Sequence, residues 1–165
     1  MRTIDTPEIN VFWQDACTAL EINIDSPHIA CAFAEATSPD RVSAIDAIGE
    51  LSLSNQKRGT AHLELQFKTD GIPMRNIGDY WIVLKCDGSP ICVVKIIALD
   101  IVPFNQVGPV FAASEGEGDL SLDYWRNVHG RYFKAQCERW GKEWRDDFSV
   151  VCESFITVYR PDASV

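Results

Sequence analysis

Apolar residues recur at helical spacing in three segments of the chain, and each segment follows a residue that can cap a helix. The first cap is Thr6 and the second is Ser38, and in both cases a proline stands at the first helical position. The third cap is Ser121, and its helix is predicted to run to about Arg139. The apolar stripe of each segment predicts three amphipathic helices that pack one side on the rest of the molecule.

Four further segments have the apolar patterns of β-strands and are bounded by turn-forming residues: 60–67, 80–86, 90–99 and 149–158. In the first of them Leu63, Leu65 and Phe67 alternate with polar residues, which is typical of a half-buried strand. Asp87-Gly88-Ser89 separates the second from the third and predicts a β-hairpin.

The remaining segments and the mixture of elements indicate the fold class. Residues 28–34 are a short strand or an extended link, and residues 103–110 are a connector. Strands joined by turns, with one long helix crossing between sheet edges, are typical of an α+β domain built on a small mixed sheet or barrel. A chain of 165 residues with 46% hydrophobic content fits a single domain with a core of its own.

The net charge limits the partners of the protein. A formal charge of -9 weighs against a protein that holds duplex DNA or long RNA by electrostatics, because phosphate affinity rests on lysine and arginine releasing counterions. A short single strand, a loop or a single nucleoside remains compatible with this charge, since stacking and contacts to base edges can hold it.

The cysteines and the hydropathy indicate the compartment. None of the six cysteines forms a C-x-x-C pair or a zinc-binding spacing, and most of them stand among apolar neighbours. Buried, reduced thiols are therefore favoured over disulfides, although Cys86 and Cys92 flank the predicted hairpin turn. No apolar run approaches the ~18 residues of a membrane span. We expect a cytoplasmic protein without a membrane segment.

Candidate chemistry is concentrated just before the third helix. Glu115, Glu117 and Asp119 alternate with glycines there, and three like charges so close together repel one another unless a cation answers them. Lys57 and Arg58 are the candidate cations. The acidic segment can be a general acid/base site, a solvated helix entry or a divalent metal site, because Mg²⁺ needs only one or two carboxylates.

The same segment carries a family resemblance. Phe111-Ala-x-x-Glu-Gly-Glu-Gly-Asp-x-Ser-Leu-x-x-Trp-Arg-x-x-His129, together with Gly78-Asp79-Tyr80 and Lys57-x-x-Thr60, resembles the ASCH domain family. The resemblance covers roughly residues 33–159. It implies a β-barrel similar to the RNA-associated PUA fold, and divides the chain into an N-terminal helical extension, 1–32, and an ASCH domain, 33–165.

The resemblance also implies site residues. In short members of the family a Lys-x-x-Thr pair and a glutamate are linked to hydrolysis of the acetyl amide of N4-acetylcytidine, and in longer members a ribonuclease acting on single-stranded RNA has been proposed. Lys57 and Thr60 take the first two places and Glu117 the third, for which Glu115 competes. Family members often carry Gly-Lys-Lys-Thr, whereas here the glycine is displaced to Gly59, which changes the expected shape of the loop.

Each candidate residue has a functional and a plain interpretation. A neutral Lys57 can activate Thr60 as a nucleophile, whereas a charged Lys57 stabilises negative charge; the plain alternative is an exposed lysine. Arg126 can contact phosphate with Arg58, and His129 can transfer protons, or the two can pair with loop carboxylates and pack. Tyr80, Trp81 and Tyr124 can stack on a base, or belong to the core.

Three functions remain after this comparison. The first is a hydrolase of the ASCH type that acts on single-stranded RNA as a ribonuclease. The second is a nucleoside amidohydrolase that uses Thr60 as its nucleophile. The third is a module that binds RNA or a modified base without catalysis. No cofactor is implied beyond the divalent metal that the acidic segment can hold.

Overall fold

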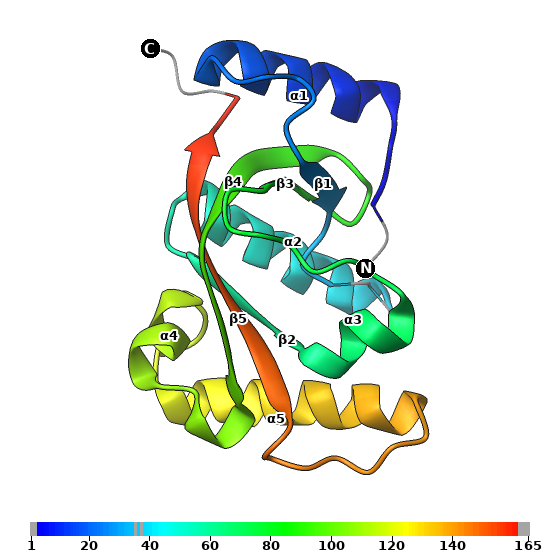
Figure 1. The fold of residues 1–165 in the computed structure, drawn as a ribbon, viewed down its shortest axis with the longest axis vertical. Coiled ribbons are helices and arrows are strands. Elements are labelled where there is room, and N and C mark those ends of the chain that lie inside the picture. The colour runs from blue at the N-terminus through cyan, green and yellow to red at the C-terminus, as the bar shows by residue number, and fades with distance from the viewer. Residues whose placement is uncertain (1–2, 35, 37, 162–165) are drawn as a thin grey trace.

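The computed structural model describes residues 3–34, 36 and 38–161. In this part of the chain one five-stranded sheet, in the order β1-β3-β4-β5-β2, is surrounded by helices (Figure 1). The predicted α+β class is therefore confirmed. The edge strands β1 and β2 do not pair with each other, so the sheet is open and the expected barrel describes it only loosely.

The strands pair mainly in the antiparallel sense. They are β1 His28–Cys31, β2 Gly59–Leu63, β3 Tyr80–Leu84, β4 Pro90–Pro103 and β5 Ser149–Tyr159. The pair β1–β3 is parallel, and the other three pairs are antiparallel. The predicted hairpin between β3 and β4 is confirmed, and its turn is closed by a hydrogen bond of 2.9 Å from the Lys85 amide to the Ser89 carbonyl.

The three predicted amphipathic helices begin at their expected caps. They are α1 Pro7–Leu20, α2 Pro39–Leu53 and α5 Leu122–Arg139. Thr6 Oγ1 accepts from the Ile9 amide at 3.3 Å, and Ser121 Oγ accepts from the Tyr124 amide at 3.0 Å. Ser38 occupies the cap position of α2 without a side-chain hydrogen bond to the helix.

The strand predicted over residues 60–67 is wrong beyond Leu63. Residues Glu64–Asp70 form the helix α3, which ends at Gly71 with φ +64°. The pairing with β5 stops at Leu63↔Val150, one residue from the start of β5, so the chain has no strand partner beyond this point and turns into a helix. The Asp70-Gly71 turn signal is therefore a helix C-cap.

The connector predicted over residues 103–110 is more structured than expected. The strand β4 continues to Pro103, and the 3-10 helix η1, Phe104–Gln106, follows it. A short helix that was not predicted, α4 Pro109–Ser114, then leads into the acidic segment. Its proline stands at the first helical position, where the N–H donor that proline lacks would have no partner within the helix.

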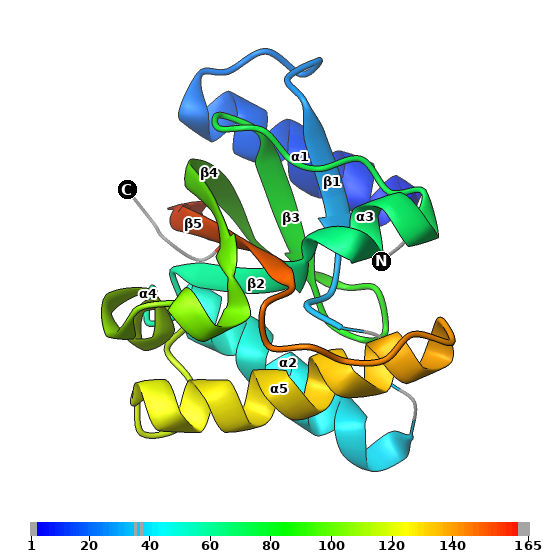
Figure 2. The ribbon, with the colours of Figure 1, turned by 60° about the horizontal axis from the view of Figure 1, so that its bottom comes forward.

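The helices cover the sheet at different places. In both views α1 and α5 lie at opposite ends of the molecule (Figures 1 and 2). Trp13 of α1 packs with Tyr80 and Ile82 of β3, whereas Trp125 and Phe133 of α5 pack with a separate cluster that includes β2 and β5. The predicted N-terminal extension thus contributes a helix to the packing of the sheet.

The sulfur chemistry agrees with the pattern of the sequence. All six cysteines, which lie in the described part of the chain, are free, and Cys86 is the one that is not buried. Burial raises the pKa of the Cys92 and Cys152 thiols to about 12. Among the described residues no helix has the length and apolar character needed to cross a membrane.

Candidate active site

Lys57 lies at the corner where α2 leads into β2. The backbone amides of Gln56 and Lys57 both donate to the Leu51 carbonyl, which ends the helix and turns the Lys57 side chain into the molecule. Lys57 is only 1% exposed, and its amine lies 5.1 Å from the centre of the Phe33 ring. The plain interpretation of Lys57 as an exposed lysine is therefore wrong.

The acidic segment lies against this corner. Gln56 Nε2 donates to the Gly116 carbonyl at 2.8 Å, and the Arg58 amide donates to the Ser114 carbonyl at 2.7 Å. Gly116 adopts φ +75°, and a Cβ at this position would lie 2.7 Å from the Gln56 carbonyl oxygen. Only glycine allows this close approach, which brings the two carboxylates of the segment to Lys57.

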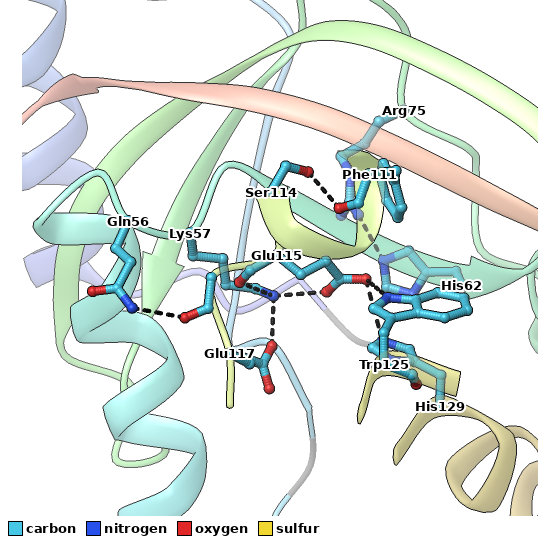
Figure 3. Close-up of polar contacts among 11 residues, drawn as sticks. Gln56, Lys57, His62, Arg75, Phe111, Ser114, Glu115, Glu117, Trp125 and His129 are labelled. Carbon is cyan, nitrogen blue, oxygen red and sulfur yellow. Dashed lines mark hydrogen bonds and ion pairs between the residues drawn. The ribbon is translucent and has the colours of Figure 1, made fainter. Parts of the chain in front are cut away.

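The amine of Lys57 is held between two carboxylates (Figure 3). Its Nζ lies 2.8 Å from Glu115 Oε2 and 2.7 Å from Glu117 Oε1. Burial would lower the pKa of the amine, but the attraction of Glu115 and Glu117 outweighs burial and raises it. Lys57 is therefore a cation, and the predicted meeting of the basic corner with the acidic loop is confirmed.

Glu115 is the buried member of the pair. Besides Lys57, its Oε1 accepts from Trp125 Nε1 at 2.7 Å and lies 3.3 Å from His129 Nε2. Burial would raise the pKa of this carboxyl group, but the charges of Lys57 and His129 hold it well below its usual value. Glu115 is therefore an ionised anchor, with its oxygens occupied by protein groups.

Glu117 is the member that meets solvent. Its side chain is 21% exposed, whereas that of Glu115 is 3% exposed. Both glutamates line a small pocket with Tyr124 and His129, and the interior, of about 10 Å³, has room for about one water molecule. Glu117 is thus the carboxylate that an incoming molecule can reach.

Comparisons with known proteins identify the family of the chain. A family model described as "ASCH domain" matches residues 35–159. The chain belongs to the ASCH domain family. The match spans both the Lys57 corner and the acidic loop. The division at residue 32 stays a prediction, because the match begins at residue 35 and leaves the role of the first residues open.

Solved structures give the same fold. The chain is similar to an ASCH domain from Lactobacillus crispatus JV V101, with 29% identity, a TM-score of 0.82 and coverage of 94% of this chain and 96% of that chain. It is also similar in fold to a protein from Enterococcus faecalis V583, with 24% identity, a TM-score of 0.77 and coverage of 96% and 97%. No curated protein matches the chain.

Thr60 of this ASCH domain is separate from the Lys57 amine. The three hydrogen bonds of Lys57 Nζ go to the Glu115 side chain, the Glu115 carbonyl and Glu117, and none goes to Thr60. Thr60 is buried in β2, opposite Glu153 of β5. The pairing of Lys57 with Thr60 that the family motif implied is not among the contacts of the described residues.

A second buried charge cluster lies on the same face of the sheet as Thr60. Arg75 Nε donates to Glu153 Oε2 at 2.7 Å, and Arg75 Nη2 lies 3.0 Å from His62 Nε2. Burial and then the Arg75 charge lower the pKa of His62 to about 3, so this ring is neutral. Sequence reasoning assigned no partner to His62. The one sign of this cluster in the sequence is Glu153, an acidic residue that directly follows the apolar run 150–152.

Of the four residues predicted to bind substrate, His129 lies at the pocket and the other three lie elsewhere. His129 lines the pocket and stacks on Trp125, with ring centres 4.3 Å apart. Arg58 is exposed, and Arg126 donates to the Asn105 carbonyl at 3.2 Å instead of facing the pocket. Tyr80 is buried in the core against Trp13, so of its two interpretations the geometry favours the core residue.

The acidic segment is arranged around a lysine. Its third carboxylate, Asp119, accepts from the Ser121 amide at 2.9 Å and belongs to the helix entry. Within residues 3–34, 36 and 38–161, no group of three or more His, Cys, Asp or Glu side chains is placed to hold a metal ion. Glu115 and Glu117, two of the carboxylates that the sequence offered for Mg²⁺, are paired with Lys57.

Proposed function

We propose that this ASCH domain cleaves single-stranded RNA at the pocket lined by Glu115, Glu117 and His129, beside the buried amine of Lys57. The observation that carries the proposal is the position of the Lys57 amine between a buried and a partly exposed carboxylate. A fixed cation beside a carboxylate that solvent can reach combines charge stabilisation with a proton acceptor, and phosphodiester cleavage needs both.

The charge of Lys57 favours one of the two chemical routes. An amine whose pKa is raised by Glu115 and Glu117 carries its proton at neutral pH and cannot remove one from Thr60. The same charged amine can stabilise the negative charge that develops on a phosphoryl group. The contacts therefore favour an electrostatic role for Lys57 over activation of a threonine nucleophile.

Glu117 and His129 supply the proton transfers. Glu117 takes the proton of the ribose 2′-hydroxyl, whose oxygen then attacks the adjacent phosphorus. As this bond forms, the bond from phosphorus to the 5′-oxygen breaks, and the leaving oxygen takes a proton from His129. The products are a 2′,3′-cyclic phosphate and a 5′-hydroxyl. His129 lies in the same pocket, where Trp125 O is 3.1 Å from its Nδ1 and Glu115 Oε1 is 3.3 Å from its Nε2.

The form of the site limits the substrate to a flexible strand. The interior of the pocket holds about one water molecule, so the strand has to lie across the mouth and present one sugar and phosphate to Glu117. A net charge of -9 gives little general attraction to phosphate. Both features support a single strand over a duplex as the substrate.

The test uses a short labelled strand and a matched pair of variants. Glu117→Gln keeps the size of the side chain and removes the proton acceptor, so we expect cleavage to fall by at least about 100-fold, the usual size of a general base contribution. Lys85→Met, which removes an exposed lysine paired with Glu50, should leave the rate unchanged. A strand with a single 2′-deoxyribose should resist cleavage at that position.

Two outcomes would overturn this proposal. One is full activity in Glu117→Gln, and the other is cleavage that continues at the 2′-deoxyribose. A third outcome, firm binding of RNA by the wild-type protein without fragments, would leave the domain as a binding module.

One observation favours a second candidate, hydrolysis of an acyl group on a nucleobase. Asp119 and Asp123 are exposed close to Glu117 along the chain, and such an acidic surrounding suits a neutral nucleoside better than a phosphate. Glu117 would take a proton from water, and the water oxygen would attack the acyl carbon as the base amine leaves with a proton. Release of acetate from N4-acetylcytidine, lost in Glu117→Gln, would support this reaction in place of strand cleavage.

A further inference from the structure

Tyr124 is the exposed aromatic residue of the candidate site. Within the described part of the chain, which includes every Phe, Trp and Tyr, it is the one aromatic side chain that is exposed, at 39%. It stands in the first turn of α5 and lines the same pocket as Glu117 and His129. Its burial thus differs from that of Tyr80 and Trp81, which lie in the core.

The Tyr124 ring is held in place by the acidic loop. Gly118 adopts φ +60°, and a Cβ at this position would lie 2.4 Å from two atoms of the ring, so the ring packs directly against the backbone of the loop. The Tyr124 amide donates to Ser121 Oγ at 3.0 Å, which fixes the helix turn that carries the ring. An aromatic ring fixed in advance loses little conformational entropy when a ligand stacks on it.

The surroundings of the ring indicate which part of a nucleotide it meets. Asp119 and Asp123 are exposed and both shortly precede Tyr124 along the chain, and Glu117 lines the pocket with it. These carboxylates repel a phosphate, whereas an uncharged base can approach an aromatic face. Base stacking on such a ring tolerates any base, because every base has a π-face.

We infer that Tyr124 is a stacking platform that holds one unpaired nucleobase at the mouth of the pocket. The inference rests on the proposed function, since it assumes that a nucleic acid or nucleoside is the substrate, and it adds the residue that positions it. Stacking at Tyr124 places the sugar of that nucleotide next to Glu117. A duplex cannot supply such a base without being opened, which gives a structural reason for selectivity toward single strands.

The test measures stacking directly. A 2′-O-methylated strand of about eight nucleotides, within the usual site size, resists cleavage through the 2′-oxygen and carries one fluorescent 2-aminopurine at successive positions. On binding to the wild-type protein, we expect fluorescence to be quenched at one position. Tyr124→Ala should weaken binding by roughly 5- to 140-fold, the usual contribution of one stacked base, and should abolish the quenching.

Matched variants separate stacking from a general loss of apolar surface. Tyr124→Phe keeps the ring and should retain the quenching, whereas Tyr124→Leu keeps apolar bulk and should lose it. Ile77→Ala removes an exposed apolar side chain, 64% exposed in the 71–79 loop, and should leave binding unchanged. Thermal unfolding of each variant checks that the fold is retained.

The outcomes distinguish the inference from the proposed function. If the wild-type protein binds the strand but Tyr124→Ala binds it equally well, or if Tyr124→Leu retains the quenching, the platform is refuted and the proposed function stands. If the wild-type protein binds neither the strand nor a free nucleoside, the proposed function is refuted and the platform with it.

Discussion

Replacing Lys57 by methionine tests the buried ion cluster on which the candidate site is built. Methionine has nearly the same length and is also unbranched, so the substitution removes the charge and leaves most of the packing against Phe33. Glu115 then stays buried without its main counter-charge, although Trp125 Nε1 still donates to it. Glu117 is partly exposed and can be solvated by water.

The magnitude follows from the burial of Glu115. Removing one partner of a buried ion pair usually costs about 3–5 kcal/mol, because the remaining charge has lost its compensation. The remaining contacts of Glu115 to Trp125 and His129 place the expected loss of unfolding free energy near the lower limit, about 3 kcal/mol at neutral pH. For the exposed pair Lys85–Glu50, at 3.4 Å, the same substitution should cost less than about 1 kcal/mol.

The loss should depend on pH with a defined sign. In the wild type the pKa of Glu115 lies below its usual 4.5, so its contribution to stability is present above pH 4.5 and is lost as the pH falls through the folded value. Without Lys57, burial raises the folded pKa above the unfolded one, and stability is then lost as the pH rises. The difference between wild type and Lys57→Met should therefore be largest at neutral pH and should shrink toward pH 4.

Urea unfolding of wild type, Lys57→Met and Lys85→Met at several pH values measures this difference. Adding Glu115→Gln to Lys57→Met should recover part of the stability at neutral pH, because the uncompensated charge is removed. The reasoning is refuted if Lys57→Met destabilises the protein no more than Lys85→Met, or if the difference is the same at pH 4 and at pH 7.

Three further predictions concern the loop, the second cluster and the ligand. Gly116→Ala should cost about 1–3 kcal/mol and most of the activity, whereas Gly78→Ala, also at positive φ but in open space, should affect stability alone; unfolding and cleavage assays compare them. The pKa of His62 is lowered from 6.5 to about 3, so the unfolding free energy should decrease as the pH drops from 6.5 toward 3, by about 1.4 kcal/mol per pH unit. Urea unfolding at several pH values should show that His62→Gln lacks this dependence. Binding of a single strand should fall only weakly with salt, with a logarithmic slope no steeper than about −1.5, equivalent to about two phosphate contacts; a fluorescence titration at several salt concentrations measures it.

Local signals in the sequence predicted most of the elements. The caps Thr6 and Ser121 and the turn around Gly88 act within a few residues, so the helices and the hairpin could be read from the chain. The failure at residues 64–67 has a non-local cause. Whether Leu65 and Phe67 continue a strand depends on where the partner strand β5 starts, and β5 starts at Ser149, far along the chain.

The candidate site was predictable where charges of opposite sign had to meet. Three carboxylates in five residues needed a cation, and the structure provides it at Lys57, 58 residues from Glu115 along the chain. Sequence reasoning could not decide between Glu115 and Glu117, because the difference lies in burial and in the Trp125 contact. The Tyr80 interpretation was left open for the same reason, since an aromatic residue in a strand can face either side of the sheet.

The two buried charge clusters have different physical meanings. A buried ion pair is weak evidence for stability, because apolar residues of similar volume are often as stabilising. The Arg75–Glu153 pair nevertheless has a packing context, since the guanidinium lies 4.5 Å from the centre of the Trp81 ring. The Lys57 cluster opens through Glu117 to a pocket, where an apolar replacement would remove charge that a ligand can reach through that opening. An apolar replacement of Lys57 and the two glutamates should therefore remove the proposed function even where the fold stays stable.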